Sequence, residues 1–126
     1  ELTQKRYAIT RDLTAQIYKV AFDGHSLANE CDRGVVNVHR VWWVQAETVI
    51  GFLDGYEKET EKTEYLEAAE KEWALIRDHV IDKRPGSEWF WEVDPEGNPY
   101  PGRPIVEPWK CPYHNGRMCM EVMKRC

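Results

Sequence analysis

One histidine near the end of the chain lies among aromatic residues, prolines and cysteines. The stretch VEPWKCPYHNGRMCMEV, residues 106–122, contains His114 and, five positions earlier, Trp109. An imidazole with an unperturbed pKa near ~6.5 can take up and release a proton at neutral pH. From these residues alone, a histidine that caps or packs at the start of the last helix is the more frequent explanation, and proton transfer is the alternative.

The same stretch raises the question of a metal site built from Cys111, His114 and Cys119. The spacing Cys-x2-His followed by x4-Cys matches no common zinc site, and no second pair of ligands lies nearby. Nothing in the sequence places a thiol beside an activating base. We therefore predict no metal, no cofactor and no cysteine nucleophile, and expect reduced thiols in a cytoplasmic protein.

Six tryptophans in 126 residues are a large number. Those in or beside predicted loops are Trp42, Trp43, Trp89, Trp91 and Trp109. Indole rings stack on the flat apolar faces of sugars, while charged and amide groups bond the sugar hydroxyls. On this evidence alone, a sugar-binding pocket and an ordinary aromatic core are equally well supported.

Length and composition predict one globular domain with one core, since the chain is 42% hydrophobic and 31% charged. The net charge of −5 argues against nucleic acid or an anionic membrane as a partner. No apolar run approaches the roughly 18 residues of a membrane span, and no signal peptide is visible. The chain opens ELTQKRYAIT without an initiator methionine, so we expect it to be part of a longer protein.

Apolar residues at helical spacing predict four helices that position these side chains. The first is marked by Ile9, Leu13, Ile17 and Val20 and ends near residue 23. The others are expected over residues 41–56, 65–80 and 115–126. The polar stretch 57–64 is short and suits an antiparallel helix pair. Gly51 and Gly55 either weaken the second helix or let a neighbouring helix approach closely.

Two loops carry signals of β structure. Residues 26–40 contain short extended runs around Asp32-Arg33-Gly34, which predicts a hairpin, and residues 87–100 turn through Pro95-Glu96-Gly97-Asn98. The predicted fold is therefore all-α, with α/α hairpins and short β-hairpins in the loops. Such an arrangement places the chemistry at the loop ends over a helical scaffold.

Three segments of the chain closely resemble the C-terminal part of cellobiose 2-epimerases, within the N-acylglucosamine 2-epimerase family. They are HRVWWVQAETVIGFLDGYEKET, YLEAAEKEWALIRDHVID and EWFWEVDPEGNPYPGRPIVEPWKCPYHNGRMCMEV. The likeness runs in order from about Gly24 to Arg125, and WWVQAE and WKCPYHNGRMC are highly specific strings. The resemblance implies that residues 1–126 form the C-terminal part of a single (α/α)6-barrel domain, which binds sugar at its loop-decorated mouth.

The resemblance also implies an activity. Enzymes of this kind invert C2 of the reducing-end glucose in β-1,4-linked disaccharides such as cellobiose. C2 loses and regains its proton through a cis-enediolate, without metal or redox cofactor. His114 sits in the motif of one of two proton-transferring histidines. Trp109 corresponds to the tryptophan that stacks on the sugar, and Trp43 and Glu47 to the pocket wall.

The partner histidine and a substrate-binding arginine would lie before Glu1, so the 126-residue chain is expected to be inactive alone. Its apolar surfaces would need the remainder of the barrel, or self-association, to cover them. A non-catalytic carbohydrate-binding module and a self-associating helical module are the alternatives from other functional classes.

Overall fold

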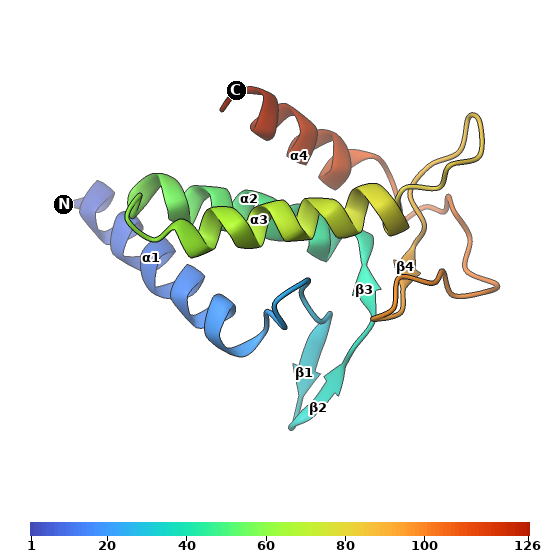
Figure 1. Cartoon of the computed structure of the whole chain (residues 1–126), viewed down its shortest axis with the longest axis horizontal. Helices are drawn as coiled ribbons and strands as arrows, with labels where there is room; N and C mark the ends of the chain where they lie inside the picture. Colours follow the sequence, from blue (N-terminus) through green and yellow to red (C-terminus); the bar gives the residue numbers. More distant parts are fainter.

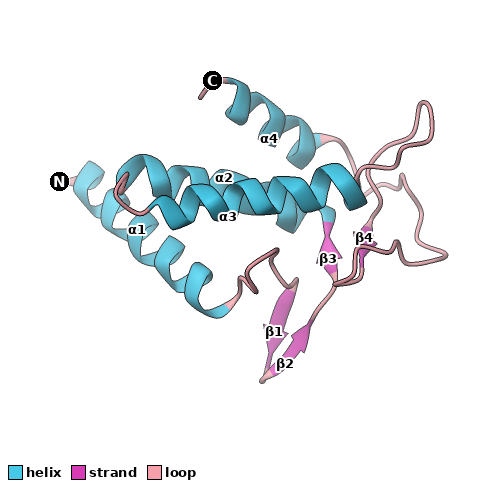
Figure 2. Cartoon of the chain, in the orientation of Figure 1, coloured by secondary structure: helices cyan, strands magenta, loops and turns pink.

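The computed structural model describes residues 1–126 as a layer of helices with two small sheets at one end (Figures 1 and 2). The helices are α1 (Leu2–Val20), α2 (Trp42–Lys58), α3 (Thr63–Leu75) and α4 (Tyr113–Met123), and α3 continues into a π-helical turn, η1 (Ile76–Val80). The strands are β1 (Glu30–Asp32), β2 (Val35–Asn37), β3 (Arg40–Val41) and β4 (Glu92–Val93). The predicted helix-rich fold with short β elements in its loops is confirmed.

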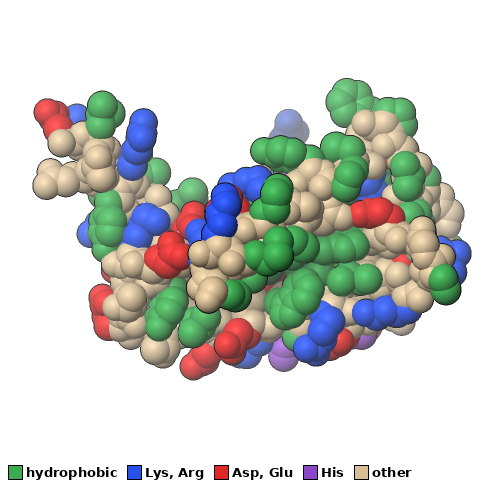
Figure 3. Space-filling view, turned by 90° about the horizontal axis from the view of Figure 1, so that it is seen from above, with side chains coloured by type: hydrophobic (Ala, Val, Ile, Leu, Met, Phe, Trp, Pro, Cys, Tyr) green, Lys and Arg blue, Asp and Glu red, His purple; other side chains and the backbone are tan.

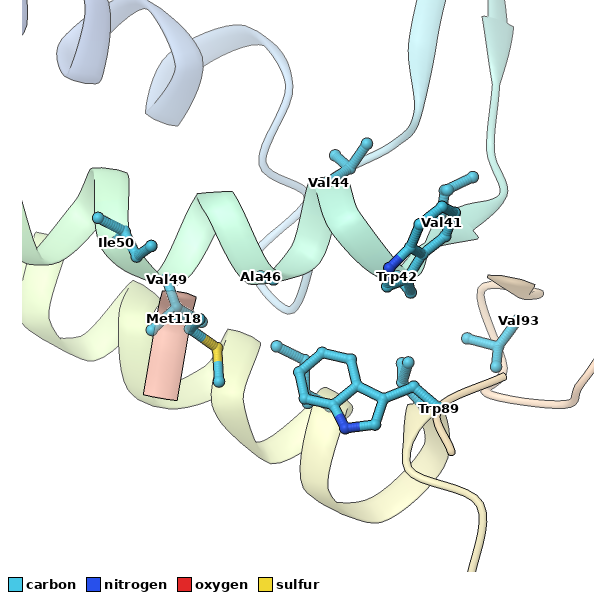
Figure 4. Close-up of a cluster of buried hydrophobic side chains, with 11 residues drawn as sticks. Val41, Trp42, Val44, Ala46, Val49, Ile50, Trp89, Val93 and Met118 are labelled. Atoms are coloured by element: carbon cyan, nitrogen blue, oxygen red, sulfur yellow. The ribbon is translucent and has the colours of Figure 1, made fainter. Parts of the chain in front are cut away.

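Helix α2 is the centre of the fold, because it contacts α1, α3 and α4. Its buried side chains pack with Ile76 and Val80 from η1 and with Met118 from α4. Figure 4 shows the Trp89 indole, which comes from the loop after α3, entering the same cluster. This core therefore joins α2 and α4 to the loop that precedes β4.

Gly55 allows α1 to approach α2 closely. A Cβ atom built on Gly55 would lie 2.5 Å from the Thr14 side chain, which is buried under α2. Gly51, in contrast, has open space where its Cβ would be. The close-approach explanation is thus confirmed for Gly55 and does not apply to Gly51.

The apolar stripe that predicted α1 is largely exposed. Leu13 is 56% exposed, and Ile9 and Val20 are 66% and 65% exposed. The helix is correctly predicted, but within residues 1–126 only Ile17 of its stripe packs against a buried cluster, which consists of Phe52, Tyr65, Ala68 and Ala69. Periodicity reports where apolar side chains point, not what packs against them.

The first predicted hairpin is confirmed as β1 and β2, with Cys31 paired to Val36 and Asp32 to Val35. Arg33 and Gly34 form its two-residue turn with positive φ angles of 49° and 83°, which suits the right-handed strand twist.

The second predicted β segment forms its turn, where the Asp94 N–H donates to the carbonyl of Asn98 at 2.9 Å. Its strand β4 pairs with β3, more than fifty residues earlier, with Arg40 opposite Val93 and Val41 opposite Glu92. This pairing fixes the loop after α3 against the start of α2.

The remaining helix boundaries differ from prediction by a few residues. The connection between α2 and α3 is only 59–62, and α4 begins at Tyr113, which places His114 in its first turn. None of the helices combines the length and apolarity that a membrane span requires.

Candidate active site

The candidate site lies where the first turns of α2 and α4 meet. Glu47 lies four residues, about one turn, after Trp43 on α2, and Arg117 lies three residues after His114 on α4. Side chains three or four residues apart share one face of a helix. The contact between α2 and α4 therefore brings two pairs of side chains from distant parts of the chain together.

One carboxylate joins the two helices. Glu47 Oε1 lies 2.9 Å from His114 Nδ1, and Arg117 Nη1 donates to Glu47 Oε2. The three side chains, called the site triad below, are each about one third exposed. They are thus held by one another and remain accessible to a ligand.

The triad keeps Glu47 ionised. Burial opposes its ionisation, but the hydrogen bonds from His114 and Arg117 outweigh that effect and hold the pKa of Glu47 below its ordinary value. The bond to Glu47 in turn raises the pKa of the Arg117 guanidinium. An ionised carboxylate only accepts hydrogen bonds, so Nδ1 of His114 carries the hydrogen. In the neutral ring Nε2 then has the free lone pair and can act as a base.

An aromatic hollow of about 310 Å³ opens beside the triad. Its lining consists of Trp42, Trp43, Trp91, Trp109 and His114. The ring centroids of Trp43 and His114 are 5.6 Å apart, and Trp109 is 84% exposed. Exposed indoles beside an imidazole and charged groups form a surface suited to the face and hydroxyls of a sugar. We call this lining the aromatic hollow.

The structure brings together all four site residues that the sequence predicted. His114 and Glu47 are in direct contact, and Trp43 and Trp109 line the same hollow as His114. Capping by His114 is not seen, because α4 has no side-chain cap hydrogen bond and the imidazole bonds Glu47 instead. The other alternative, a histidine that packs at the start of this helix, is compatible with its contact with Trp43.

Sequence reasoning missed Arg117 and the place of Trp91 in the hollow. A signal for Arg117 was available, because it lies one helical turn after His114. For Trp91 the only signal was its place among the loop tryptophans, which left a sugar pocket and an aromatic core equally supported, because only the pairing of β3 with β4 brings its loop to α2. Cys111 and Cys119 are exposed free thiols, and no group of three or more His, Cys, Asp or Glu side chains is arranged to hold a metal ion.

Comparison with known proteins gives the family of the chain. The family model for N-acylglucosamine 2-epimerase (GlcNAc 2-epimerase) matches residues 5–115. The chain belongs to the N-acylglucosamine 2-epimerase family.

Characterised relatives make the likeness more specific. The chain is 52% identical to a cellobiose 2-epimerase of Eubacterium cellulosolvens over 98% of its length. It matches the crystal structure of a sugar epimerase from a ruminal bacterium with a TM-score of 0.93 and 41% identity over 98% of the chain. The cellobiose 2-epimerase structure from Bacillus thermoamylovorans B4167 matches 91% of the chain with a TM-score of 0.83 and 41% identity. The chain spans 30%, 32% and 29% of these three proteins, respectively.

Proposed function

We propose that the protein containing this chain is a sugar epimerase that inverts C2 of the reducing-end glucose in β-1,4-linked disaccharides such as cellobiose. The observation that carries the proposal is the ionised Glu47 that orients His114 beside the aromatic hollow. The names of the similar proteins support the choice of reaction and substrate class.

The chemistry follows from the reacting atom. In the open-chain sugar, C2–H lies next to the aldehyde carbon, so its proton can be removed to give a cis-enediolate. Neutral His114 takes that proton at Nε2, and the Glu47 carboxylate stabilises the imidazolium that forms. Arg117 shares the carboxylate and keeps it anionic.

Inversion requires a proton from the opposite face of C2, and we assign that step to a second histidine outside residues 1–126. Trp109 and Trp43 hold the sugar through stacking on their rings. Within this proposal, α1 to α4 form the C-terminal part of an (α/α)6 barrel, and no metal or redox cofactor takes part.

A self-associating helical module is a second candidate, favoured by an apolar groove between α3 and α4. The groove has a volume of about 400 Å³ and nine hydrophobic residues among its ten lining residues, including Trp73, Met118 and Val122. Figure 3 shows hydrophobic side chains gathered along the middle of the face seen from the α4 side. Exposed apolar patches of this kind favour association. At micromolar concentration we expect dimers or larger species of the isolated chain in analytical ultracentrifugation, and a compact monomer with a sharp melting transition would contradict this.

Incubation with cellobiose, followed by chromatographic separation of glucosyl-mannose, tests the main proposal. The complete gene product should convert cellobiose, whereas the 126-residue chain should not, because it holds one of the two proton-transferring groups. A complete protein that binds cellobiose without converting it would instead be a carbohydrate-binding module. Turnover by the isolated chain would contradict the assignment of the second histidine to another segment.

A further inference from the structure

Glu88 contacts the residue that follows each of two site residues. Lys110, next to Trp109, donates from Nζ to Glu88 Oε2. Asn115, next to His114, donates from Nδ2 to Glu88 Oε1. One carboxylate therefore uses one oxygen for each of the two segments that carry the site.

The Lys110 side of this contact is firmly held. Lys110 is 3% exposed, whereas the adjacent Trp109 is 84% exposed. The Lys110 Nζ also donates to the carbonyl oxygens of Trp89 at 2.5 Å and Ile105 at 2.8 Å. A buried ammonium with three acceptors has little freedom, and charge-assisted bonds are the stronger ones. The buried Lys110 side chain thereby restrains the backbone next to Trp109.

The Asn115 side acts through helix geometry. Successive side chains on an α-helix point about 100° apart, so neighbours face different directions. Asn115 is 7% exposed and bonds Glu88 inside the protein, while His114 lines the hollow. The bond from Asn115 thus restrains rotation of the first turn of α4, and with it the direction of the His114 imidazole.

We infer that Glu88 is a positioning residue that sets the relative placement of the stacking surface, Trp109, and the proton-transferring group, His114. Its own segment also carries Trp91, which lines the hollow together with Trp109 and His114. This inference rests on the proposed function. Misplacing reacting groups by about 1 Å can cost on the order of 10²-fold in rate, so a partial loosening here should lower turnover by about tenfold.

The first test is E88Q in the complete protein. Glutamine keeps the shape but presents an NH₂ donor where one of the two donors, Lys110 or Asn115, needs an acceptor. With folded molecules counted by near-ultraviolet circular dichroism, kcat per folded molecule on cellobiose should fall about tenfold. The matched control is E96Q, the same change at an exposed carboxylate in the turn after β4, which should stay within twofold of the unmodified protein.

If E88Q fails to fold, the contacts of Glu88 with Asn115 and with Lys110 can be tested by separate variants. N115A loosens only the His114 side, so kcat per folded molecule should fall with KM unchanged. K110M loosens only the Trp109 side, so KM should rise by a larger factor than kcat falls. A merely structural role would reduce the folded fraction and leave both constants per folded molecule unchanged.

The role of Glu88 would be overturned if N115A and K110M changed kcat and KM in the same way. It would also be overturned if kcat and KM stayed within twofold of the unmodified protein in every variant. That result is distinguishable from failure of the proposed function. If the unmodified complete protein does not epimerise cellobiose, the proposed function is wrong. If it does, and kcat and KM of the variants are unchanged, only the positioning role of Glu88 is wrong.

Discussion

Two groups of the same composition lie at the loop end of the molecule, and only one faces the aromatic hollow. The site triad has a counterpart in Glu92, His39 and Arg103, called the second triad here. His39 Nδ1 lies 2.9 Å from Glu92 Oε2, and Arg103 Nε donates to Glu92 Oε1 at 2.7 Å. In both triads one carboxylate bonds a histidine and an arginine; these are neighbours on α4 in the site triad, whereas His39 and Arg103 come from distant parts of the chain.

The surroundings of the two triads differ. The Glu92 side chain is only 5% exposed, against 31% for Glu47. The imidazole of His39 stacks on the Tyr100 ring with centroids 4.1 Å apart, and Arg103 lies over the Trp91 ring at 5.8 Å. The two histidine side chains are equally exposed, at 32% for His39 and 33% for His114, so the triads differ in the burial of the carboxylate and in what the imidazole faces. His39 lies against the Tyr100 ring, whereas His114 lies at the wall of the aromatic hollow.

This difference shows that residue types and bonds do not by themselves define a reactive site. In both carboxylates burial opposes ionisation, and bonds from histidine and arginine outweigh it and lower the pKa. Glu92 lies in β4, opposite Val41 of β3. We conclude that the second triad fastens the loop after α3 to the start of α2, and so supports the wall that carries Trp91.

The largest expected contrast is between H114N and H39N in the complete protein. H114N removes the proposed acid/base and should lower kcat on cellobiose by about 10²–10⁴-fold while sugar binding, measured by calorimetry, stays nearly intact. H39N should keep turnover per folded molecule within about twofold. If H114N retained a tenth or more of the turnover, within roughly 1.4 kcal/mol of the native barrier, His114 would not be the acid/base.

The aromatic partners of the two histidine regions provide the next contrast. W109A removes an exposed stacking surface and should weaken cellobiose binding by about tenfold and lower turnover as well, since stacking contributes roughly 0.5–1.5 kcal/mol beyond burial. Y100A removes the ring over His39 and should leave the affinity unchanged. Calorimetric titration of both variants measures this, and equal losses would mean that the sugar also contacts Tyr100.

We expect the second triad to contribute more to the free energy of unfolding than the site triad does. E92Q leaves Arg103 and His39 with a neutral partner in a buried position, so we expect the free energy of unfolding to fall by about 1–3 kcal/mol. E47Q changes a more exposed, better solvated group and should cost less than about 1 kcal/mol. Urea denaturation of the two variants gives the comparison, and an equal or larger loss in E47Q would show that burial does not separate the triads.

The smallest expected effect is on the pH dependence of stability. The pKa of Glu92 is lower in the folded protein than in the unfolded chain, so its contribution is fully present above the unfolded pKa, near ~4.3, and is lost as pH falls through the folded pKa. The difference in unfolding free energy between the unmodified protein and E92Q should therefore shrink below about pH 4.

Taking the difference isolates Glu92 from other carboxyls, such as Glu72, whose burial raises its pKa and gives the opposite slope. A difference that stays constant from neutral to strongly acidic pH would show that Glu92 does not contribute through its charge.

The parts of the fold that were predictable are local ones. Helix α2, the turn at Arg33 and Gly34, and the start of α4 within two residues of its true position follow from spacing and turn chemistry among near neighbours. The four site residues were assigned through specific strings that resemble a known family, since a lone histidine or tryptophan carries little information by itself.

The sequence by itself thus determined which segments are helical, and it marked His114 and its neighbours as the place of chemistry. Only the tertiary structure decided that Arg117 shares Glu47 with His114, that β4 pairs with β3, and that a second triad with a buried carboxylate exists. The physical reason is that helix and turn formation depend on residues a few positions apart. Ion pairs and access to solvent depend on which distant segments pack together, and periodicity contains no record of that.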